Sequence, residues 1–359
     1  SDVYKRHGYG GTERIVSYLT EELVRMGHQV VLFASGDSVT QAHLISPCKK
    51  SLRLDEGCQD RICHHILMIE EVFKRAMHFD IIHFHIDYLH FPMVRRCDTP
   101  TLTTLHGRMD LQDYVPLYRE FREIPVVSIS YAQREPLPWL NWQGTVYHGL
   151  PLDLYCLHKR PGKYLAFLGR ISPEKRPDRA IRIAEEVGME LKMAAKVDQV
   201  DRDYYERVIS PLLKSPYVDF IGEIGDGEKE EFLGGAYALL FPIDWPEPFG
   251  LVMIEAMACG TPVIAWRRGS VPEVIEDGVT GFVVDNMKDA VKAVQEVSRL
   301  DRSRCRQVFE ERFTASRMAK DYLRIYERLR RREEPLLNLS YTVSYTHLRA
   351  HETRHDLVC

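Results

Sequence analysis

Two glutamates, Glu247 and Glu255, lie on either side of a predicted helix start at Gly250. An apolar run at residues 238–241 leads into a proline-rich loop that carries Glu247, and the helix after this loop carries Glu255. The first backbone N–H groups of a helix lack intrahelical partners and attract anions, so a phosphate suits this position. Because Glu255 lies more than one turn inside the helix, the two carboxylates should contact different parts of one ligand.

Two cations, Arg170 and Lys175, lie between a predicted strand (residues 164–168) and a predicted helix (177–187). Isolated arginines and lysines are usually solvated surface charges. At the carboxyl end of a strand, two cations suit a diphosphate, because guanidinium and ammonium groups form charge-assisted hydrogen bonds to phosphate oxygens. Because Arg170 and Lys175 are expected at a cleft, we favour diphosphate binding over solvated surface charges.

Two glycines and a histidine are candidates in the first half of the chain. Gly10 and Gly11 precede a predicted helix whose apolar repeat starts at Ile15. Glycine lets a phosphate approach the backbone closely, although a plain turn explains the pair equally well. His106, followed by Gly107, ends a predicted strand at the edge of a sheet where ligands bind.

Other polar residues favour structural roles. His83 and His85 share one face of a strand, but no third ligand stands at a metal-binding spacing, so we expect hydrogen-bonded histidines and no metal. Glu273 and Asp285 lie at the ends of predicted elements in the second half of the chain. We expect them to be a carboxylate at a helix N-terminus and an acidic loop residue, respectively.

Strand-like and helix-like runs alternate along most of the chain, which predicts parallel sheets covered by helices on both faces. Ligands in such sheets bind at the carboxyl ends of the strands. The expected strands are residues 29–34, 79–85, 101–105, 125–129, 145–147, 164–168, 190–195, 217–221, 238–241, 262–265 and 281–284. The expected second-half helices are residues 177–187, 203–213, 228–234 and 250–258.

The pattern stops over residues 149–162 and then resumes, and 359 residues exceed what one hydrophobic core usually organises. We therefore expect an α/β protein with two doubly wound Rossmann-like domains facing a cleft. No apolar strand precedes Gly10, so the first strand of the first domain is expected to be missing. The expected segments are a first domain at 1–150, a linker at 151–163, a second domain at 164–315, a terminal helix at 316–335 and a non-native tail at 339–359, which we exclude from the functional argument.

Composition excludes some classes of function. With a formal net charge of -4 and no basic stripe interleaved with aromatic residues, we expect no nucleic-acid partner. The eight cysteines form no CxxC pair, which is typical of a reducing compartment, so a cytoplasmic location is expected. No apolar run reaches the length of a membrane span, while peripheral membrane contact stays open.

Taken together, these residues resemble the retaining glycosyltransferases of family 4, which have the GT-B fold, and among them the bacterial members with a Gly-Gly-Thr-Glu-Arg motif. The spacing of Glu247 and Glu255 is similar to the EX7E signature of that family. The resemblance spans about residues 9 to 330 and keeps the order of the motifs, which are 10–14, 105–107, 169–170 with 174–175, 247–255 and 260–264.

The resemblance implies transfer of a hexose from a nucleoside-diphosphate sugar, with UDP-glucose the preferred donor and a GDP-sugar the second choice. It implies that the terminal helix crosses back to the first domain and that no metal or other cofactor is bound. The residues implied to act in catalysis are Glu247 and His106 at the sugar and Arg170 and Lys175 at the diphosphate. Those implied to bind the donor are Gly10, Gly11, Phe249, Gly250 and Leu251 at phosphate and sugar, Ile224 at the base and Glu255 at the ribose.

Alternatives remain open at this stage. A nucleotide-sugar epimerase or a non-catalytic nucleotide-sugar-binding protein would use the same donor residues. A glycoside hydrolase has no use for Arg170 and Lys175, and a dinucleotide oxidoreductase is disfavoured because residues 10–14 do not read GxGxxG. The acceptor is not identified, since the loops at residues 38–61 and 109–122 carry no recognisable chemical signature.

Overall fold

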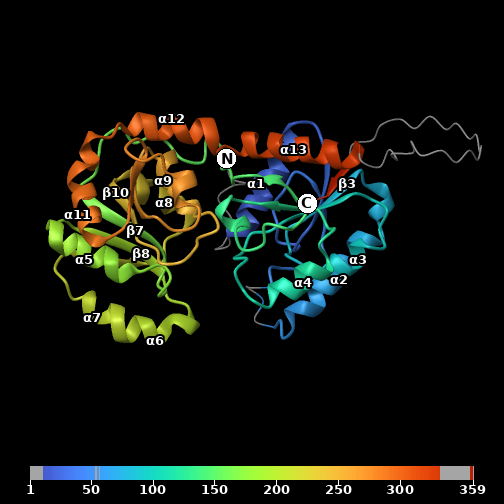
Figure 1. Ribbon diagram of the computed structural model, residues 1–359, viewed down its shortest axis with the longest axis horizontal. Helices are drawn as coiled ribbons and strands as arrows, with labels where there is room; N and C mark the ends of the chain where they lie inside the picture. Colours follow the sequence, from blue (N-terminus) through green and yellow to red (C-terminus); the bar gives the residue numbers. More distant parts are fainter. Residues whose placement is uncertain (1–10, 53–54, 56, 332–355, 359) are drawn as a thin grey trace, which may run out of the picture.

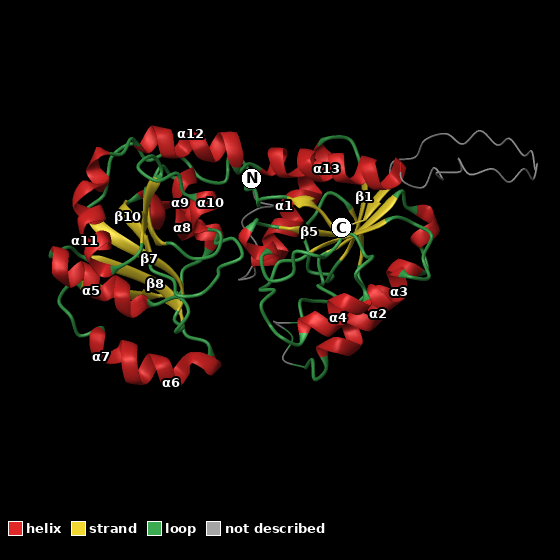
Figure 2. Ribbon diagram, in the orientation of Figure 1, coloured by secondary structure: helices red, strands yellow, loops and turns green. Residues whose placement is uncertain are grey.

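The computed structural model describes residues 11–52, 55, 57–331 and 356–358. These residues form two lobes, each with a parallel sheet between helices (Figures 1 and 2). The first lobe holds the blue and teal part of the chain in Figure 1, and the second holds the green to orange part. This architecture confirms the predicted pair of Rossmann-like domains.

The sheet of the first lobe has the strand order β2-β1-β13-β3-β4-β5-β6, and its neighbours pair in parallel. The sequence predicts that the first strand of this domain is missing, and in the structure β13, from the far end of the chain, lies between β1 and β3. The remainder of the segment expected to be a tail, residues 339–355 and 359, lies outside the described residues. The strands are β1 (Gln29–Phe33), β2 (His43–Ile45), β3 (Ile81–Phe84), β4 (Thr101–Thr104), β5 (Val126–Ser128), β6 (Trp142–Thr145) and β13 (Asp356–Val358).

Helix α1 (Gly11–Arg25) begins earlier than the sequence predicts. The glycine-rich motif was expected to precede the helix, but Thr12, Glu13 and Arg14 form its first turn. The apolar repeat does face the core, as predicted, since Ile15 and Leu19 are fully buried. The other helices of this lobe are α2 (Arg61–Phe73), η2 (Ala76–His78), α3 (Phe91–Val94), α4 (Tyr114–Glu120) and η3 (Ala132–Arg134).

The sheet of the second lobe has the order β12-β11-β10-β7-β8-β9, again parallel. Strands β7 and β10 are neighbours although many residues separate them in the chain. Their carboxyl ends therefore bring the loop with Lys175 next to the loop with Glu247. The strands are β7 (Tyr164–Arg170), β8 (Leu191–Lys196), β9 (Val218–Gly222), β10 (Ala236–Phe241), β11 (Val263–Trp266) and β12 (Gly281–Val284).

Besides α1, the predicted elements at 203–213 and 145–147 differ from the structure. The helix expected over residues 203–213 is divided into α6 (Arg202–Tyr204), the π turn η5 (Tyr205–Ile209) and α7 (Ser210–Leu212). Pro211 lacks an N–H group, so an uninterrupted α-helical ladder cannot pass through this segment. The strand expected at 145–147 instead ends at Thr145, as β6.

The other second-lobe helices are α5 (Pro177–Val187), η4 (Gln199–Asp201), α8 (Asp226–Gly234), α9 (Leu251–Ala258), α10 (Val271–Val274), α11 (Met287–Glu296), η6 (Val297–Arg299) and α12 (Arg302–Arg312). Helix α13 (Ala315–Arg331) follows them in sequence but lies along the first lobe (Figure 1). There the Tyr326 hydroxyl lies 2.7 Å from Nδ1 of His83, and the Tyr322 hydroxyl lies 2.9 Å from Oγ1 of Thr104. None of the described helices is long and apolar enough to cross a membrane.

Candidate functional site

The loops after β7 and β10 meet through an ion pair. The Lys175 ammonium contacts Oε2 of Glu247, and the Trp245 indole N–H donates to the same oxygen at 2.9 Å. The ammonium also lies 5.4 Å from the ring centre of Phe241 and 5.3 Å from that of Trp245. The lysine assigned to the diphosphate and the glutamate assigned to the sugar therefore hold each other in place.

The backbone at Glu247 is fixed by the loop after β11. Gly269 has a φ of +51°, and a Cβ atom there would lie 2.3 Å from the Glu247 carbonyl oxygen. Ser270 donates its N–H to that oxygen at 3.0 Å and its hydroxyl to the Phe249 carbonyl at 2.8 Å. No side chain fits at position 269, so this glycine determines where Glu247 and Phe249 lie.

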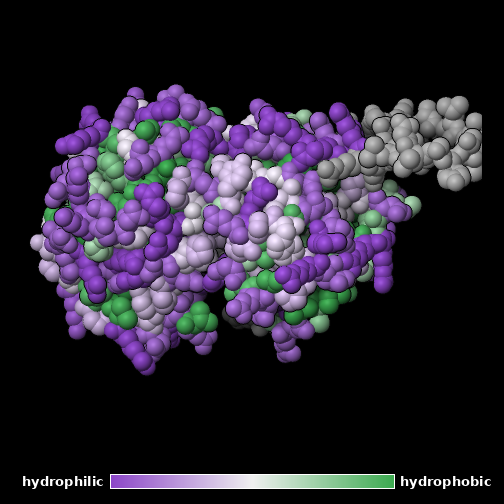
Figure 3. Space-filling model, in the orientation of Figure 1, coloured by the Kyte–Doolittle hydropathy of each residue, from purple (hydrophilic) through white to green (hydrophobic). Residues whose placement is uncertain are grey.

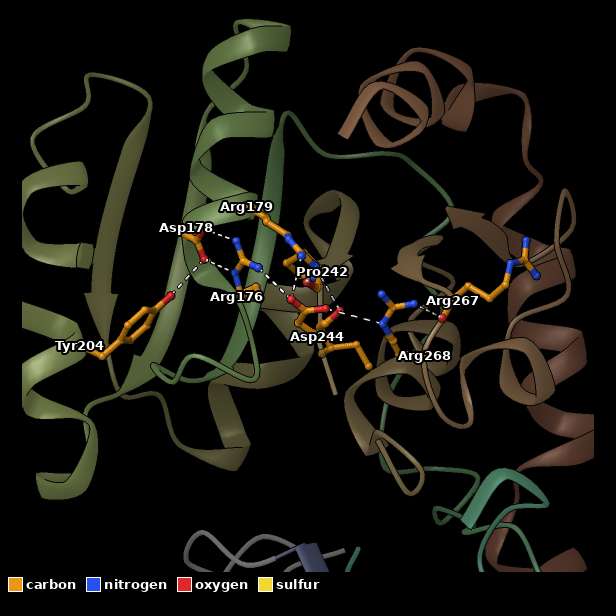
Figure 4. Close-up of polar contacts among 9 residues, drawn as sticks. Arg176, Asp178, Arg179, Tyr204, Pro242, Asp244, Arg267 and Arg268 are labelled. Carbon is orange, nitrogen blue, oxygen red and sulfur yellow. Dashed lines mark hydrogen bonds and ion pairs between the residues drawn. The ribbon is translucent and has the colours of Figure 1, made fainter. Parts of the chain in front are cut away.

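Asp244 ties three loops together just before Trp245 (Figure 4). Its Oδ2 accepts hydrogen bonds from Arg176 and Arg179, both at 2.9 Å, and Arg268 lies 3.6 Å from its Oδ1. Its backbone N–H donates to the Glu174 carbonyl at 2.8 Å. The loops after β7, β10 and β11 are thereby joined three residues before Glu247.

The start of α1 in the first lobe lies next to the start of α9 in the second. Gly250 has a φ of +80° and precedes α9, with no side-chain cap on that helix start. A Cβ atom on Gly11, the first residue of α1, would lie 3.3 Å from Cδ1 of Leu251. Two helix N-termini with their unpaired N–H groups favour an anion between them. Gly10 lies outside the described residues.

Glu255 is buried, and its partners come from both lobes. Its Oε1 lies 2.6 Å from the Arg14 guanidinium, accepts the Tyr155 hydroxyl at 3.3 Å and lies 3.9 Å from the Lys229 ammonium. Burial acts to raise the pKa of Glu255, but Arg14 and Lys229 outweigh it and hold the pKa below its usual value. The carboxylate is therefore charged at neutral pH.

Arg170 has different partners from Lys175. Its guanidinium lies 3.2 Å from Asp201, 3.6 Å from Glu174 and 3.7 Å from Asp198. The two predicted cations thus both lie at the carboxyl end of β7, with Arg170 as its last residue and Lys175 in the loop that follows, but they pair with different acids. Ile224, which is assigned to the base, lies between β9 and α8, and its side chain is buried. Helix α8 carries Lys229.

His106 belongs to a group of histidines in the first lobe. Its Nε2 lies 2.9 Å from Nδ1 of His85, and its ring stacks on His148 with ring centres 5.3 Å apart. The His148 ring in turn meets Phe249 of the second lobe edge-on, at 4.8 Å. Burial lowers the pKa of His106 to about 4, so its ring is neutral at pH 7.

The expected hydrogen-bonded state of His83 is confirmed, since its ring nitrogens lie 2.7 Å from the Tyr326 hydroxyl and 2.8 Å from Oγ1 of Thr104. Within the described part of the chain, no group of three or more His, Cys, Asp or Glu residues could hold a metal ion.

Two family models match the chain. One, described as glycosyl transferases group 1, matches residues 157–312, and the other, Glycosyltransferase Family 4, matches residues 9–143. Among solved structures, sucrose-phosphate synthase from Thermosynechococcus elongatus has a TM-score of 0.72 at 18% identity, over 89% of this chain and 94% of its own. Anabaena HepE in complex with UDP and glucose has a TM-score of 0.71 at 17% identity, over 90% of this chain and 98% of its own.

The chain has the GT-B fold, and each of its two lobes matches a glycosyltransferase family model. Among curated relatives of this GT-B protein, D-inositol 3-phosphate glycosyltransferase of Mycolicibacterium smegmatis is 34% identical over 211 residues, which is 54% of this chain and 46% of the relative. An uncharacterized 41.2 kDa protein in the cps region of Klebsiella pneumoniae is 29% identical over 170 residues, which is 45% of this chain and 46% of the relative. The matched segments span less than half the length of these relatives.

Several polar contacts join the lobes of this GT-B protein. Besides Arg14 and Glu255, Arg108 lies 3.3 Å from Glu174. Glu273 accepts the backbone N–H groups of Tyr131 and Ala132, both at 2.7 Å. Glu273 therefore lies in the first turn of α10, as its sequence position predicts, and its carboxylate also accepts the N–H groups at the start of η3 in the other lobe. A notch still separates the lobes along the lower edge of the face in Figure 3.

Sequence reasoning missed several residues of this GT-B site. Gln133 donates its side-chain amide to the carbonyls of Leu105 and Gly107, at 2.9 and 2.8 Å, and so fixes the loop of His106. Arg14 belongs to a motif that the sequence did single out, whereas Tyr155 and Gln133 belong to no recognisable local pattern. Their importance depends on contacts between segments far apart in the chain.

Proposed function

We propose that this chain is a retaining glycosyltransferase of the Gly-Gly-Thr-Glu-Arg type, which moves a hexose from a nucleoside-diphosphate sugar to an acceptor hydroxyl. UDP-glucose is the preferred donor and a GDP-sugar the second choice. One observation carries the proposal: the starts of α1 and α9 lie side by side, and Glu247, which pairs with Lys175, lies only three residues before Gly250 at the start of α9. The solved complexes of Anabaena HepE with UDP-glucose and with UDP and glucose support a nucleotide-sugar donor.

The donor is proposed to lie along the carboxyl edge of the second sheet. Its diphosphate binds between the two helix starts, where the unpaired N–H groups attract negative charge. Lys175 and Arg170 supply the cations on that side. The other proposed contacts are Glu255 at the ribose, the Ile224 segment at the base, and Glu247, His106 and the backbone of Phe249, Gly250 and Leu251 at the sugar.

The proposed reaction keeps the configuration at the anomeric carbon. The bond from the sugar C1 to the phosphate oxygen breaks, and a bond from C1 to the acceptor oxygen forms on the same face. The departing phosphate oxygen takes the acceptor proton, so no protein nucleophile is needed. Negative charge grows on the diphosphate as the bond breaks, and Lys175 with the two helix starts stabilises it.

The Lys175–Glu247 ion pair also fixes the orientation of the Glu247 carboxylate. The Glu247 carboxylate accepts from Lys175 and Trp245 and is therefore held in one orientation. A carboxylate fixed in this way can accept hydrogen bonds from sugar hydroxyls and set the sugar ring against the diphosphate. Glu247 is thus proposed to position the sugar rather than to act as an acid or a base.

The test is an assay of the purified chain with UDP- and GDP-sugars, each with and without a panel of acceptors. We expect nucleotide release that depends on one donor and one acceptor, a product with the donor's anomeric configuration, and no effect of EDTA. Sugar isomerisation without an acceptor would indicate an epimerase, and tight donor binding without turnover would indicate a binding protein. Failure to bind any nucleotide sugar would refute the proposal.

A further inference from the structure

Glu255 is a point where three parts of the chain converge. Arg14 reaches it from α1 of the first lobe, Tyr155 from the segment between the lobes, and Lys229 from α8 of the second lobe. Arg14 is 5% exposed and Glu255 is 3% exposed, so the charges meet away from water. Breaking a buried pair of this kind leaves an uncompensated charge, which makes each partner depend strongly on the other.

Arg14 is itself held in position. Its Nε–H donates to the Tyr18 hydroxyl at 3.2 Å, and a terminal N–H donates to the Tyr155 hydroxyl at 3.4 Å. Tyr18 lies one turn along the same helix, so α1 presents the guanidinium with little freedom to move. The guanidinium therefore acts as a fixed fork that orients Glu255.

The contacts to Glu255 fall on only one of its two oxygens. Arg14, Tyr155 and Lys229 all approach Oε1, and no hydrogen bond from the described residues reaches Oε2. A carboxylate with one oxygen engaged by a cation and the other available can accept a bidentate or single hydrogen bond from neighbouring hydroxyl groups. The ribose of a nucleotide carries such a pair of hydroxyls.

Helix α1 contacts α9 at two places along one face. Gly11 meets Leu251 at the start of α9, and one turn later Arg14 meets Glu255. The anion position and the proposed ribose position are therefore both completed by the same first-lobe helix. These contacts exist only while the lobes are together.

We propose that Arg14 is the positioning residue for the ribose, and that its ion pair with Glu255 couples nucleotide binding to closure of the two lobes. This inference rests on the proposed function, because it takes the ligand to be a nucleoside diphosphate. Arg14 holds Glu255 charged and aims Oε2 at the ribose hydroxyls, while the ribose holds Glu255 in the orientation that Arg14 requires. Binding at one lobe thereby favours docking of the other.

The experiment compares the affinity of UDP with that of 2′-deoxy-UDP by calorimetry, and GDP with 2′-deoxy-GDP if guanine is preferred. We expect the wild-type chain to bind the ribonucleotide about tenfold more tightly or better, as for a hydrogen bond to a charged group. In Arg14→Gln the preference for the ribonucleotide over the deoxyribonucleotide should fall to about two- to threefold. Arg25→Gln, on the exposed end of the same helix, should keep the wild-type preference. A purely structural loss would weaken both nucleotides equally and leave the ratio unchanged.

Two milder variants keep the test decisive if Arg14→Gln fails to fold. Arg14→Lys retains the charge without the fork, and Tyr155→Phe removes one hydroxyl; each should lower the ratio in part. Small-angle scattering should show UDP compacting the wild-type chain more than these variants. If every folded variant kept the wild-type preference for UDP over 2′-deoxy-UDP, only the proposed coupling through Arg14 would be overturned. A wild-type chain that binds no nucleotide would overturn the proposed function as well.

Discussion

The Lys175 ammonium is paired with Glu247, although the two residues follow different strands and lie far apart in the sequence. The pair forms because β7 and β10 are neighbours in the sheet, which brings their carboxyl-end loops together. Lys175 thus has two partners in the proposed complex, the carboxylate and the diphosphate.

Replacing Lys175 by alanine should lower the affinity for UDP about tenfold or more, since a charge-assisted hydrogen bond is worth about 1.5–3 kcal/mol. Glu247→Gln should instead reduce turnover much more than UDP affinity, because Glu247 is assigned to the sugar. Calorimetry and steady-state kinetics separate the two effects. Uridine, which lacks phosphate, serves as the control ligand, and unchanged UDP affinity in Lys175→Ala would disprove the lysine's assignment.

Gly269→Ala should reduce both stability and turnover. The added methyl would collide with the Glu247 backbone, and the φ of +51° adds strain of about 1–3 kcal/mol. Gly278→Ala is the matched control, since its φ of +73° carries similar strain but nothing lies within 4 Å of the added atom. Urea unfolding should therefore show a loss of stability in both variants that is larger at position 269, where the collision adds to the backbone strain, and turnover should be lost only at position 269. Equal turnover in the two variants would contradict the role of Gly269.

Gln133→Ala should lower turnover with little effect on UDP affinity, because it frees the loop of His106 in the first lobe while the proposed nucleotide site lies in the second. The carbonyls of Leu105 and Gly107 would lose their donor, at a cost of about 1–3 kcal/mol in the free energy of unfolding. Gln199→Ala, at an exposed position, is the control. Wild-type turnover in Gln133→Ala would show that the His106 loop does not need this amide.

The buried histidines should make the protein sensitive to mild acid. Burial lowers the pKa of His106 to about 4 and that of His90 to about 3, and burial with neighbouring histidines holds the pKa values of His83, His85 and His148 well below the usual 6.5. Below pH 6.5 these histidines bind protons in the unfolded chain but stay neutral in the folded chain. The free energy of unfolding therefore falls as the pH decreases.

Between pH 7.5 and 5.5, His106 alone should lower the free energy of unfolding by about 1 kcal/mol. Urea unfolding at pH 7.5, 6.5 and 5.5 measures this, in a range where most carboxylates stay charged. His78→Asn, at an exposed position, should leave the change in the free energy of unfolding between pH 7.5 and 5.5 the same as in the wild type. A flat profile over this range would mean that the buried histidines are protonated in the folded state.

Local signals in the sequence predict much of the fold. Helix α5 has the predicted bounds because Pro177 suits its first turn and Gly188 ends it in the left-handed conformation. Strand β12 likewise matches its predicted range. The early start of α1 at Gly11 was missed because glycine is a poor helix residue, and the contact that accompanies this start, with Leu251, comes from the other lobe.

The candidate site is less accessible to sequence reasoning. The chemistry of Glu247, Glu255 and Lys175 follows from their positions at strand and helix ends, which periodicity reveals. The partner of Glu255 does not follow from periodicity, since Arg14 reaches it from the other lobe. Nor does the role of Gln133, which joins its own segment to the loop of His106. Spacing along the chain carries no information about such distant pairs.

Helix α13 has a consequence for the order in which the chain folds during synthesis. Tyr322 and Tyr326, both buried, complete the interior of the first lobe, yet they leave the ribosome after the whole second lobe. Strands β7 to β12 and their helices are continuous in sequence and can assemble without any later segment. The lobe that is made first is therefore the lobe that finishes last, and until α13 arrives its apolar interior is a natural target for chaperones.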